Sequence, residues 1–178
     1  MGTLYIVGTP IGNLEDVSFR VIRILSEVDL IAAEDTRVTE KLLGRYDIKT
    51  QKTSFNKDNS SHKIPEILNV LASNDVALTT DAGTPGISDP GYELVKAVDS
   101  AGFSVIGIPG PSALTTVLSM CPFPVEGFIF TGFPPRKDVD LSKFLKHYGR
   151  LNLPLVLFES PRRLRNLLEK MILLYCDR

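Results

Sequence analysis

The chain has 178 residues, 43% of them apolar and 23% charged, and its net charge is −1. It can bury a core and has room for one domain or two small ones. Met1 leads directly into an apolar run with no basic segment or cleavage site, and Cys121 and Cys176 have no partners at metal-ligand spacing. The sequence therefore predicts a globular cytoplasmic protein without an export signal, a membrane segment, a disulfide or a metal site.

Short apolar runs alternate with segments of helical spacing. Six runs are near-continuous in apolar and β-branched residues, as is typical of buried parallel strands: residues 3–7, 29–33, 76–80, 104–108, 128–131 and 154–158. Between the first four runs, apolar residues recur at helical spacing after Asp16, after Ser61 and before Gly102. This order predicts an α/β fold with a mostly parallel sheet and flanking helices.

Two prolines suggest a domain boundary. Pro122 and Pro124 follow the helix-like residues 112–120 and are expected to stop that helix. We therefore predict an N-terminal α/β domain at residues 1–120 and the start of a second α/β domain at residues 121–178. The second part has two predicted strands and two helices, and the apolar stripe of its last helix lacks partners. The sequence thus predicts a fragment of a longer protein.

The charges are distributed unevenly along the chain. Residues 1–131 have 10 Lys and Arg against 16 Asp and Glu, a net charge of −6, whereas residues 132–178 have 10 against 5, a net charge of +5. Only the second part suits a polyanion, although basic helix faces also occur simply because they face solvent.

The loops after the predicted strands are the first candidates for chemistry, because open parallel sheets bind ligands at the carboxyl ends of their strands. Gly8 and Gly12 permit a close backbone approach, but their spacing fits neither a Walker loop nor a dinucleotide fingerprint. After the second strand, Asp35 has two interpretations. It either caps the next helix, or it faces the site and helps to accept a proton while Arg37 contacts phosphate.

The loop at residues 81–91 is the most informative segment. Three glycines and two prolines within nine residues give it a defined path, so its backbone can meet a ligand at little ordering cost. Asp89 and Pro90 are also predicted to begin the next helix. The fourth strand leads into a second rigid turn at a helix start, Pro109-Gly110-Pro111-Ser112-Ala113.

Six segments, in order along nearly the whole chain, resemble the ribosomal RNA small subunit methyltransferase I family of the tetrapyrrole-methylase superfamily. They are Val7-Gly8-Thr9-Pro10-Ile11-Gly12-Asn13-Leu14, Ala33-Glu34-Asp35-Thr36-Arg37, Asp81-Ala82-Gly83-Thr84-Pro85-Gly86, Pro109-Gly110-Pro111-Ser112-Ala113, Gly132-Phe133-Pro134-Pro135-Arg136 and Phe158-Glu159-Ser160-Pro161-Arg162-Arg163. Each motif alone is weak, but six in register are specific.

The resemblance implies two α/β domains with S-adenosyl-L-methionine in the cleft between them, usually in a homodimer. It implies 2′-O-methylation of a cytidine in the decoding region of small-subunit ribosomal RNA, either free or in the assembled small subunit. The residues it places at the methyl donor are Pro10, Asp81, Gly83, Thr84, Ile87, Ser88, Ser112 and Ala113 in the first domain, and Phe133 and Glu159 in the second.

Methyl transfer to a ribose hydroxyl requires the hydroxyl proton to leave, and a nearby carboxylate can accept it. The candidate bases are Asp35, Glu34 and Glu159. Contacts to RNA phosphates call for guanidinium and ammonium groups. The candidates for this role are Arg37, Arg136, Lys137, Arg162, Arg163 and Arg165.

Two other functions also fit parts of the sequence. A C-methyltransferase that acts on an acidic corrinoid-type macrocycle would share the fold, the donor and the basic rim, but residues 33–37 and 158–163 match the RNA branch better. A non-catalytic nucleotide- or RNA-binding module would hold a phosphate in the strand-end loops. The missing Walker lysine argues against that module.

Overall fold

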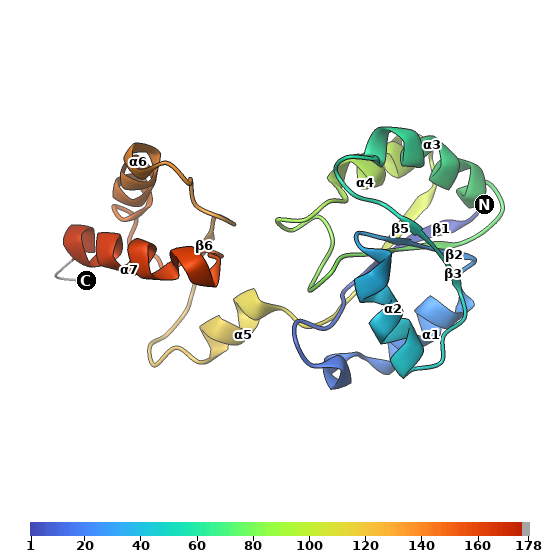
Figure 1. Cartoon of the computed structure of the whole chain (residues 1–178), viewed down its shortest axis with the longest axis horizontal. Coiled ribbons are helices and arrows are strands. Elements are labelled where there is room, and N and C mark those ends of the chain that lie inside the picture. Colours follow the sequence, from blue (N-terminus) through green and yellow to red (C-terminus); the bar gives the residue numbers. More distant parts are fainter. Residues whose placement is uncertain (176–178) are drawn as a thin grey trace. The chain divides into compact units, whose positions relative to one another are not determined.

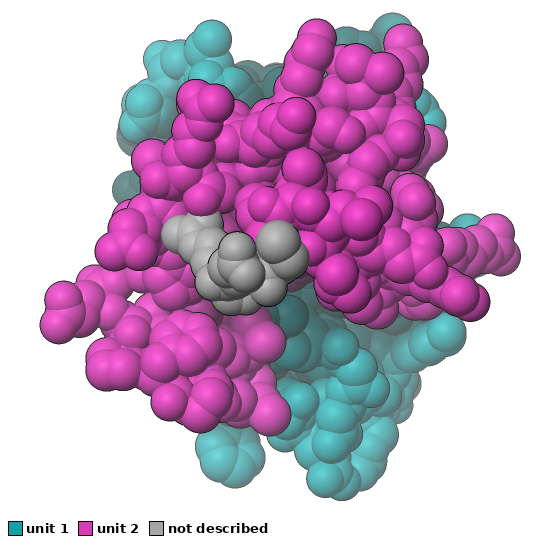
Figure 2. All heavy atoms as spheres, turned by 90° about the vertical axis from the view of Figure 1, so that its left-hand side faces the viewer, with its two compact units in different colours: residues 1–113 teal, residues 114–178 magenta. Residues whose placement is uncertain are grey.

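The computed structural model describes residues 1–175, which belong to two compact units, unit 1 at Met1–Ala113 and unit 2 at Leu114–Arg178 (Figure 2). The sequence placed the boundary after residue 120, so helix α5 (Ala113–Ser119) falls almost entirely in unit 2 instead. Val117 and Leu118 of α5 line a cavity together with other residues of unit 2.

Unit 1 is built on a five-stranded parallel sheet. Its strands are β1 (Thr3–Val7), β2 (Leu30–Ala33), β3 (Gln51–Ser54), β4 (Val76–Thr79) and β5 (Ser104–Ile108), and their order across the sheet is β3-β2-β4-β1-β5. Every neighbouring pair is parallel, and Ile6 of β1 lies opposite Leu78 on one side and Gly107 on the other. The predicted α/β class is confirmed, and all five carboxyl ends meet at one edge.

Helices cover both faces of this sheet (Figure 1). One face carries α1 (Phe19–Glu27) and α2 (Thr36–Arg45), and the other carries α3 (Ser60–Leu71) and α4 (Tyr92–Ser100); a short 3-10 helix, η1 (Leu14–Asp16), precedes α1. Two apolar clusters fill the two layers, one around Leu25 and Leu43 and the other around Ile67 and Leu94. The central strand β4 is therefore buried along its whole length.

Strand β3 was not predicted from the sequence. Its residues, Gln51 to Ser54, are polar, and the first two are exposed. A strand at the sheet edge has one open side and needs no apolar run, so the pattern that identified the other strands is missing here.

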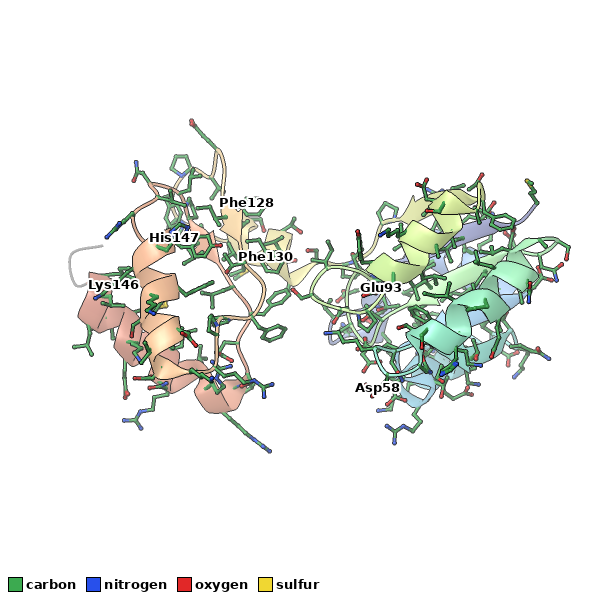
Figure 3. The ribbon with its side chains drawn as sticks, turned by 90° about the horizontal axis from the view of Figure 1, so that it is seen from above. Asp58, Glu93, Phe128, Phe130, Lys146 and His147 are labelled. Carbon is green, nitrogen blue, oxygen red and sulfur yellow. The ribbon has the colours of Figure 1, made fainter. Side chains whose placement is uncertain are left out.

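Unit 2 contains a pair of short parallel strands and two longer helices. These are β6 (Ile129–Phe130), α6 (Asp138–Tyr148), β7 (Leu155–Val156) and α7 (Pro161–Tyr175). Leu141, Leu145 and Leu167 form a small core between α6 and α7. Lys146 and His147 lie exposed on α6 (Figure 3). Within residues 1–175, no helix is both long enough and apolar enough to cross a membrane.

Candidate functional site

The carboxyl edge of the unit 1 sheet is bordered by the loops after β1, β4 and β5. A short antiparallel bridge joins the first two: Thr9 N donates to Gly83 O at 2.9 Å, and Gly83 N donates to Thr9 O at 3.2 Å. The hydroxyl of Thr9, a residue only 5% exposed, donates to Thr80 O at 3.1 Å. Because these groups are shielded from water, breaking the bonds is costly, and the two loops are held as one body.

The loops after β1 and β5 meet at two glycines. Gly8 N donates to Ile108 O at 3.0 Å. A Cβ atom added to Gly110 would lie 2.4 Å from Gly8 O, and one added to Gly8 would lie 2.8 Å from Gly110 Cα. Only glycine permits this approach, so these two motif glycines serve the contact between the loops.

The loop at residues 81–91 follows a backbone path that most side chains disfavour. Gly83, Gly86 and Ser88 have positive φ angles of 88°, 82° and 66°. Gly86 N donates to Pro90 O at 3.2 Å, which closes the loop on itself. Ile87 and Ser88 are exposed, so the loop presents one apolar and one hydroxyl side chain to solvent.

Helix α4 begins later than the sequence predicted. The assignment of Asp89 and Pro90 to its start is wrong: the first helical residue is Tyr92, and Gly91 is the N-cap with a φ of 146°. A Cβ atom on Gly91 would lie 3.1 Å from the Leu78 side chain, so the chain passes close to the sheet before the helix can start. Asp89 is left at the sheet edge rather than at the helix.

Three carboxylates at this edge form an acidic group, Glu34, Asp81 and Asp89. Glu34 Oε2 accepts hydrogen bonds from Thr80 Oγ1 at 2.5 Å and from Asp81 N at 3.2 Å. Asp81 Oδ1 accepts one from Asp35 N at 3.1 Å. Burial, and after it the Glu34 carboxylate, raise the pKa of both Asp81 and Asp89. A group of like charges at a partly buried edge favours a cationic ligand.

The acidic group is not arranged as a metal centre. Across the described residues 1–175, no group of three or more His, Cys, Asp or Glu side chains is placed to hold a metal ion. The candidate chemistry of this edge therefore rests on its loops and charges.

Asp35 is the N-cap of α2. Its Oδ1 accepts from Arg37 N at 2.8 Å, and its two oxygens accept from the Arg37 guanidinium at 2.6, 3.0 and 3.2 Å. These bonds to Arg37 lower the pKa of Asp35 to about 2. The structure thus confirms the interpretation that Asp35 caps the helix that follows it. A carboxylate of this acidity is a weak proton acceptor, and Arg37, with 87% of its side chain exposed, retains access to solvent.

In unit 2, Glu159 is anchored at the carboxyl end of β7. Its side chain is 3% exposed, Oε1 accepts from Ser160 N at 2.7 Å, and Oε2 lies 3.2 Å from Arg163 Nη2 in an ion pair that does not meet hydrogen-bond geometry. The ring of Phe133, a residue 58% exposed, packs on Phe158 with centroids 5.7 Å apart. Phe133 is accessible to a ligand, whereas Glu159 is committed to its neighbours.

The remaining predicted residues differ in accessibility. Pro10 is buried, Ser112 is half-buried, and the exposed ones are Thr84, Ala113, Arg136, Lys137, Arg162 and Arg165. The residues of unit 1 that the sequence predicts to bind the donor thus belong to loops at one edge of the sheet. The sequence missed the roles of Thr9 and Thr80, whose hydroxyls join the loops. The available signal was a threonine within two residues of the end of a buried strand.

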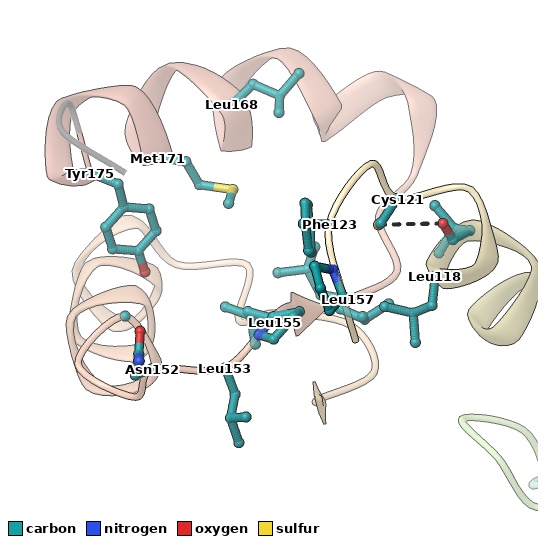
Figure 4. Close-up of a pocket in the computed structure, with 15 residues that line it drawn as sticks. Leu118, Cys121, Phe123, Asn152, Leu153, Leu155, Leu157, Leu168, Met171 and Tyr175 are labelled. Carbon is teal, nitrogen blue, oxygen red and sulfur yellow. Dashed lines mark hydrogen bonds between the residues drawn. The ribbon is translucent and has the colours of Figure 1, made fainter. Parts of the chain in front are cut away.

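An apolar cavity of about 800 Å³ lies within unit 2 (Figure 4). Its lining includes Leu118, Phe123, Leu155 and Met171, and none of its lining residues is charged. None of the predicted site residues contributes to it. Its lining has no carboxylate to attract the cationic donor, so the strand-end loops with their acidic group are the stronger candidate site.

Comparison with known proteins gives relatives along the whole chain. The relative from Thermotoga maritima, "Ribosomal RNA small subunit methyltransferase I", is 49% identical over 179 residues, which cover 100% of this chain and 80% of the relative. A protein of the same name from Halalkalibacterium halodurans is 45% identical over 178 residues and is covered to 62% of its length. The chain therefore spans less than two thirds of some curated relatives.

A solved structure shares the fold at low sequence identity. The uroporphyrin-III-C-methyltransferase from Thermus thermophilus aligns with 97% of this chain and 74% of its own, with a TM-score of 0.62 and 20% identity. The sequence profile of the Tetrapyrrole (Corrin/Porphyrin) Methylases matches residues 3–177. This chain belongs to the tetrapyrrole (corrin/porphyrin) methylase family.

Proposed function

We propose that this chain is the donor-binding part of an S-adenosyl-L-methionine-dependent enzyme that 2′-O-methylates a cytidine in the decoding region of small-subunit ribosomal RNA. The observation that carries the proposal is the sheet edge of unit 1, where backbone hydrogen bonds and glycine contacts join three loops into one rigid rim. Relatives 42–49% identical carry the name of a small-subunit ribosomal RNA methyltransferase, which supports RNA as the substrate.

The chemistry of the rim fits a methyl donor of this kind. S-adenosyl-L-methionine carries a positive sulfonium and a positive ammonium group, and the acidic group favours a cation. Ile87 offers an apolar contact and Ser88 a hydroxyl, both on an exposed loop. The residues of unit 1 that would hold the donor are Pro10, Asp81, Gly83, Thr84, Ile87, Ser88, Ser112 and Ala113. In unit 2, the exposed Phe133 remains a candidate from the family resemblance, whereas Glu159 is enclosed and engaged by Ser160 and Arg163.

The donor supplies a methyl group activated by its bond to a sulfonium. The ribose oxygen gains the methyl group, the carbon–sulfur bond breaks, and the hydroxyl proton passes to water. The three candidate bases are all engaged: Asp35 caps α2, Glu159 is buried beside Arg163, and Glu34 accepts two hydrogen bonds. We therefore propose that these carboxylates maintain the shape and the charge of the site rather than accept the proton. Most of the rate enhancement then comes from positioning the ribose hydroxyl against the methyl group.

We propose that RNA binds to unit 2 and to the exposed Arg37 of unit 1. Residues 132–178 carry a net charge of +5, and phosphate neutralisation is the main source of affinity for RNA. The exposed cations Arg136, Lys137 and Arg162 are the proposed contacts. A homodimer and a cytoplasmic location complete the proposal, and light scattering of the purified protein tests the dimer.

Methylation of a small acidic macrocycle is the competing function. The structural neighbour named for uroporphyrin methylation is only 20% identical and supports the fold alone. Relatives 42–49% identical to this chain bear the ribosomal RNA name, so we place RNA first.

The test is transfer of a labelled methyl group. Purified chain and the full-length Thermotoga maritima relative are incubated with tritiated donor and small ribosomal subunits, free small-subunit RNA or uroporphyrinogen. We expect label in RNA, with the modified position found as a linkage resistant to alkaline hydrolysis, because a 2′-O-methyl group blocks attack on the next phosphate. Label in the macrocycle, or binding of the donor without transfer to RNA by the full-length relative, would contradict the proposal.

A further inference from the structure

The cations of unit 2 fall into two classes according to their partners. Three are paired with carboxylates: Arg163 with Glu159, Arg165 with Glu169 and Lys170 with Asp138. Six others are exposed and have no ion pair within the described residues 1–175, namely Arg136, Lys137, Lys143, Lys146, Arg150 and Arg162. Unpaired cations are the ones whose charge is available to a polyanion.

Arg163 joins three segments of unit 2. Its Nη2 lies 3.2 Å from the buried Glu159 Oε2 and donates a hydrogen bond to Pro135 O at 3.0 Å. Glu159 in turn is fixed by the bond from Ser160 N. With 29% of its side chain exposed, Arg163 is mostly enclosed, so its guanidinium is used inside the protein.

The same two loops are joined at further points. Phe158 N donates to Gly132 O at 2.9 Å, and the rings of Phe133 and Phe158 pack together. The turn after β6 is therefore fixed against the start of α7 by backbone, ring and guanidinium contacts. Consecutive helical residues point about 100° apart, which is why Arg162 faces solvent while Arg163 faces the interior.

We infer that the turn before α6 and the first turn of α7 form a phosphate-binding surface, with Arg136, Lys137 and Arg162 as its ligands and Arg163 as the residue that positions them. Arg163 binds the carbonyl of Pro135, which Arg136 and Lys137 follow directly in the chain, and Arg162 directly precedes Arg163. The Arg163–Pro135 hydrogen bond therefore brings the backbone that carries these three unpaired cations together. Gathering like charges costs energy in the free protein, and the phosphates of RNA offset that cost. The inference rests on the proposed function for the identity of the polyanion.

The first measurement is the salt dependence of RNA binding by the chain, with fluorescein-labelled small-subunit RNA as the probe. Each phosphate contact contributes about 0.7–0.9 to the slope of log Kd against log salt concentration. We expect Arg136→Gln and Arg162→Gln each to flatten the slope by that amount without changing the melting temperature. The matched control is Arg23→Gln on α1 of unit 1, which has the same charge change at an exposed helix position outside the proposed surface and is expected to leave the slope intact.

The positioning role of Arg163 has its own readout. Arg163→Gln leaves the buried Glu159 carboxylate without its partner, so we expect a fall of several degrees in melting temperature together with weaker RNA binding. The double variant Glu159→Gln/Arg163→Gln removes that buried charge and is expected to recover the melting temperature and part of the RNA affinity. A direct phosphate contact by Arg163 would give no such recovery.

Two results would overturn the inference. One is that the unmodified chain does not bind RNA with a salt slope that both Arg136→Gln and Arg162→Gln reduce. The other is a flattened slope in Arg163→Gln with an unchanged melting temperature and no recovery in the double variant. Failure of the proposed function is recognised separately, by the absence of binding to S-adenosylhomocysteine, the product left when the donor loses its methyl group.

Discussion

Substitutions at Glu34 distinguish two possible roles of its carboxylate: holding the site in shape through hydrogen bonds, or accepting the proton of the ribose hydroxyl. A single oxygen, Oε2, accepts from both Thr80 Oγ1 and Asp81 N. Glutamine has the same shape, and its amide oxygen can accept both bonds, whereas alanine removes the acceptor. The pair Glu34→Gln and Glu34→Ala therefore changes the charge and the hydrogen bonds independently.

The structure sets the size of the two effects. In Glu34→Ala, the hydroxyl of Thr80, a residue 2% exposed, loses the Glu34 carboxylate but keeps Asp89 as a hydrogen-bond partner, so the loss costs about 1 kcal/mol. Asp81 lies at an exposed position where water replaces the bond to its amide. Glu34→Gln loses only the charge assistance, about 1 kcal/mol, and relieves repulsion with Asp81 and Asp89.

The assay combines thermal unfolding, calorimetric titration with S-adenosylhomocysteine and methyl transfer to RNA. For a chain of this size, 1 kcal/mol shifts the melting temperature by about 2–4 °C. We expect Glu34→Ala to melt about 2–4 °C lower and to bind the product weakly, and Glu34→Gln to stay close to the unmodified chain in all three measurements. If Glu34→Gln keeps its stability and ligand binding but loses methyl transfer, Glu34 is the base and the reasoning is refuted.

Three further predictions concern the same edge. Gly110→Ala places a Cβ atom 2.4 Å from a backbone carbonyl oxygen, so it should lower the free energy of unfolding by about 1–3 kcal/mol and weaken donor binding. Gly107→Ala is the control, because its Cβ atom would have nothing within 4 Å, and it should have neither effect. Equal effects of the two variants would contradict the loop contact. Asp81→Asn removes the repulsion between Asp81 and Glu34, so it is expected to stabilise the protein. Because folding raises the pKa of Asp81, this gain in stability should be present at pH values above that raised pKa and vanish below the ordinary value of 3.8. Urea unfolding at neutral and acidic pH measures the difference. Because folding lowers the pKa of Asp35 to about 2, its carboxylate stabilises the protein above pH 3.8, and this stabilisation is lost as the pH falls through about 2. In an acid titration followed by circular dichroism, Asp35→Asn should lose less stability between these pH values than the unmodified chain. Identical titration curves would contradict this role of Asp35.

The fold was predictable wherever burial determines the residue type. The β4 strand, covered on both faces, has a near-continuous run of apolar and β-branched residues, and its position in the sequence matches the structure. The edge strand β3 was missed because Gln51 and Lys52 face solvent and leave no apolar pattern. The start of α4 was misplaced because the close approach of Gly91 to Leu78, a tertiary contact, overrides the local capping preference of Asp89.

The site was predictable as a set of loops but not as a set of contacts. Glycine and proline spacing identified the loop at residues 81–91 because those residues constrain the backbone locally. The same pattern does not show which partner a side chain finds. Arg162 and Arg163 are identical in type and adjacent in sequence, yet one is exposed and the other reaches Glu159 and Pro135 O, since helix geometry and the fold of unit 2 decide the direction of each.

We propose that the rim formed by the loops after β1, β4 and β5 binds the methyl donor. A titration of the isotope-labelled chain with S-adenosylhomocysteine, followed by amide NMR, tests it most directly. We expect saturable shifts of the amides of Gly83, Thr84, Ser88 and Ala113, while the amides of the exposed edge strand β3 stay in place. A folded chain whose rim amides do not move, or whose shifts lie elsewhere, would contradict the account.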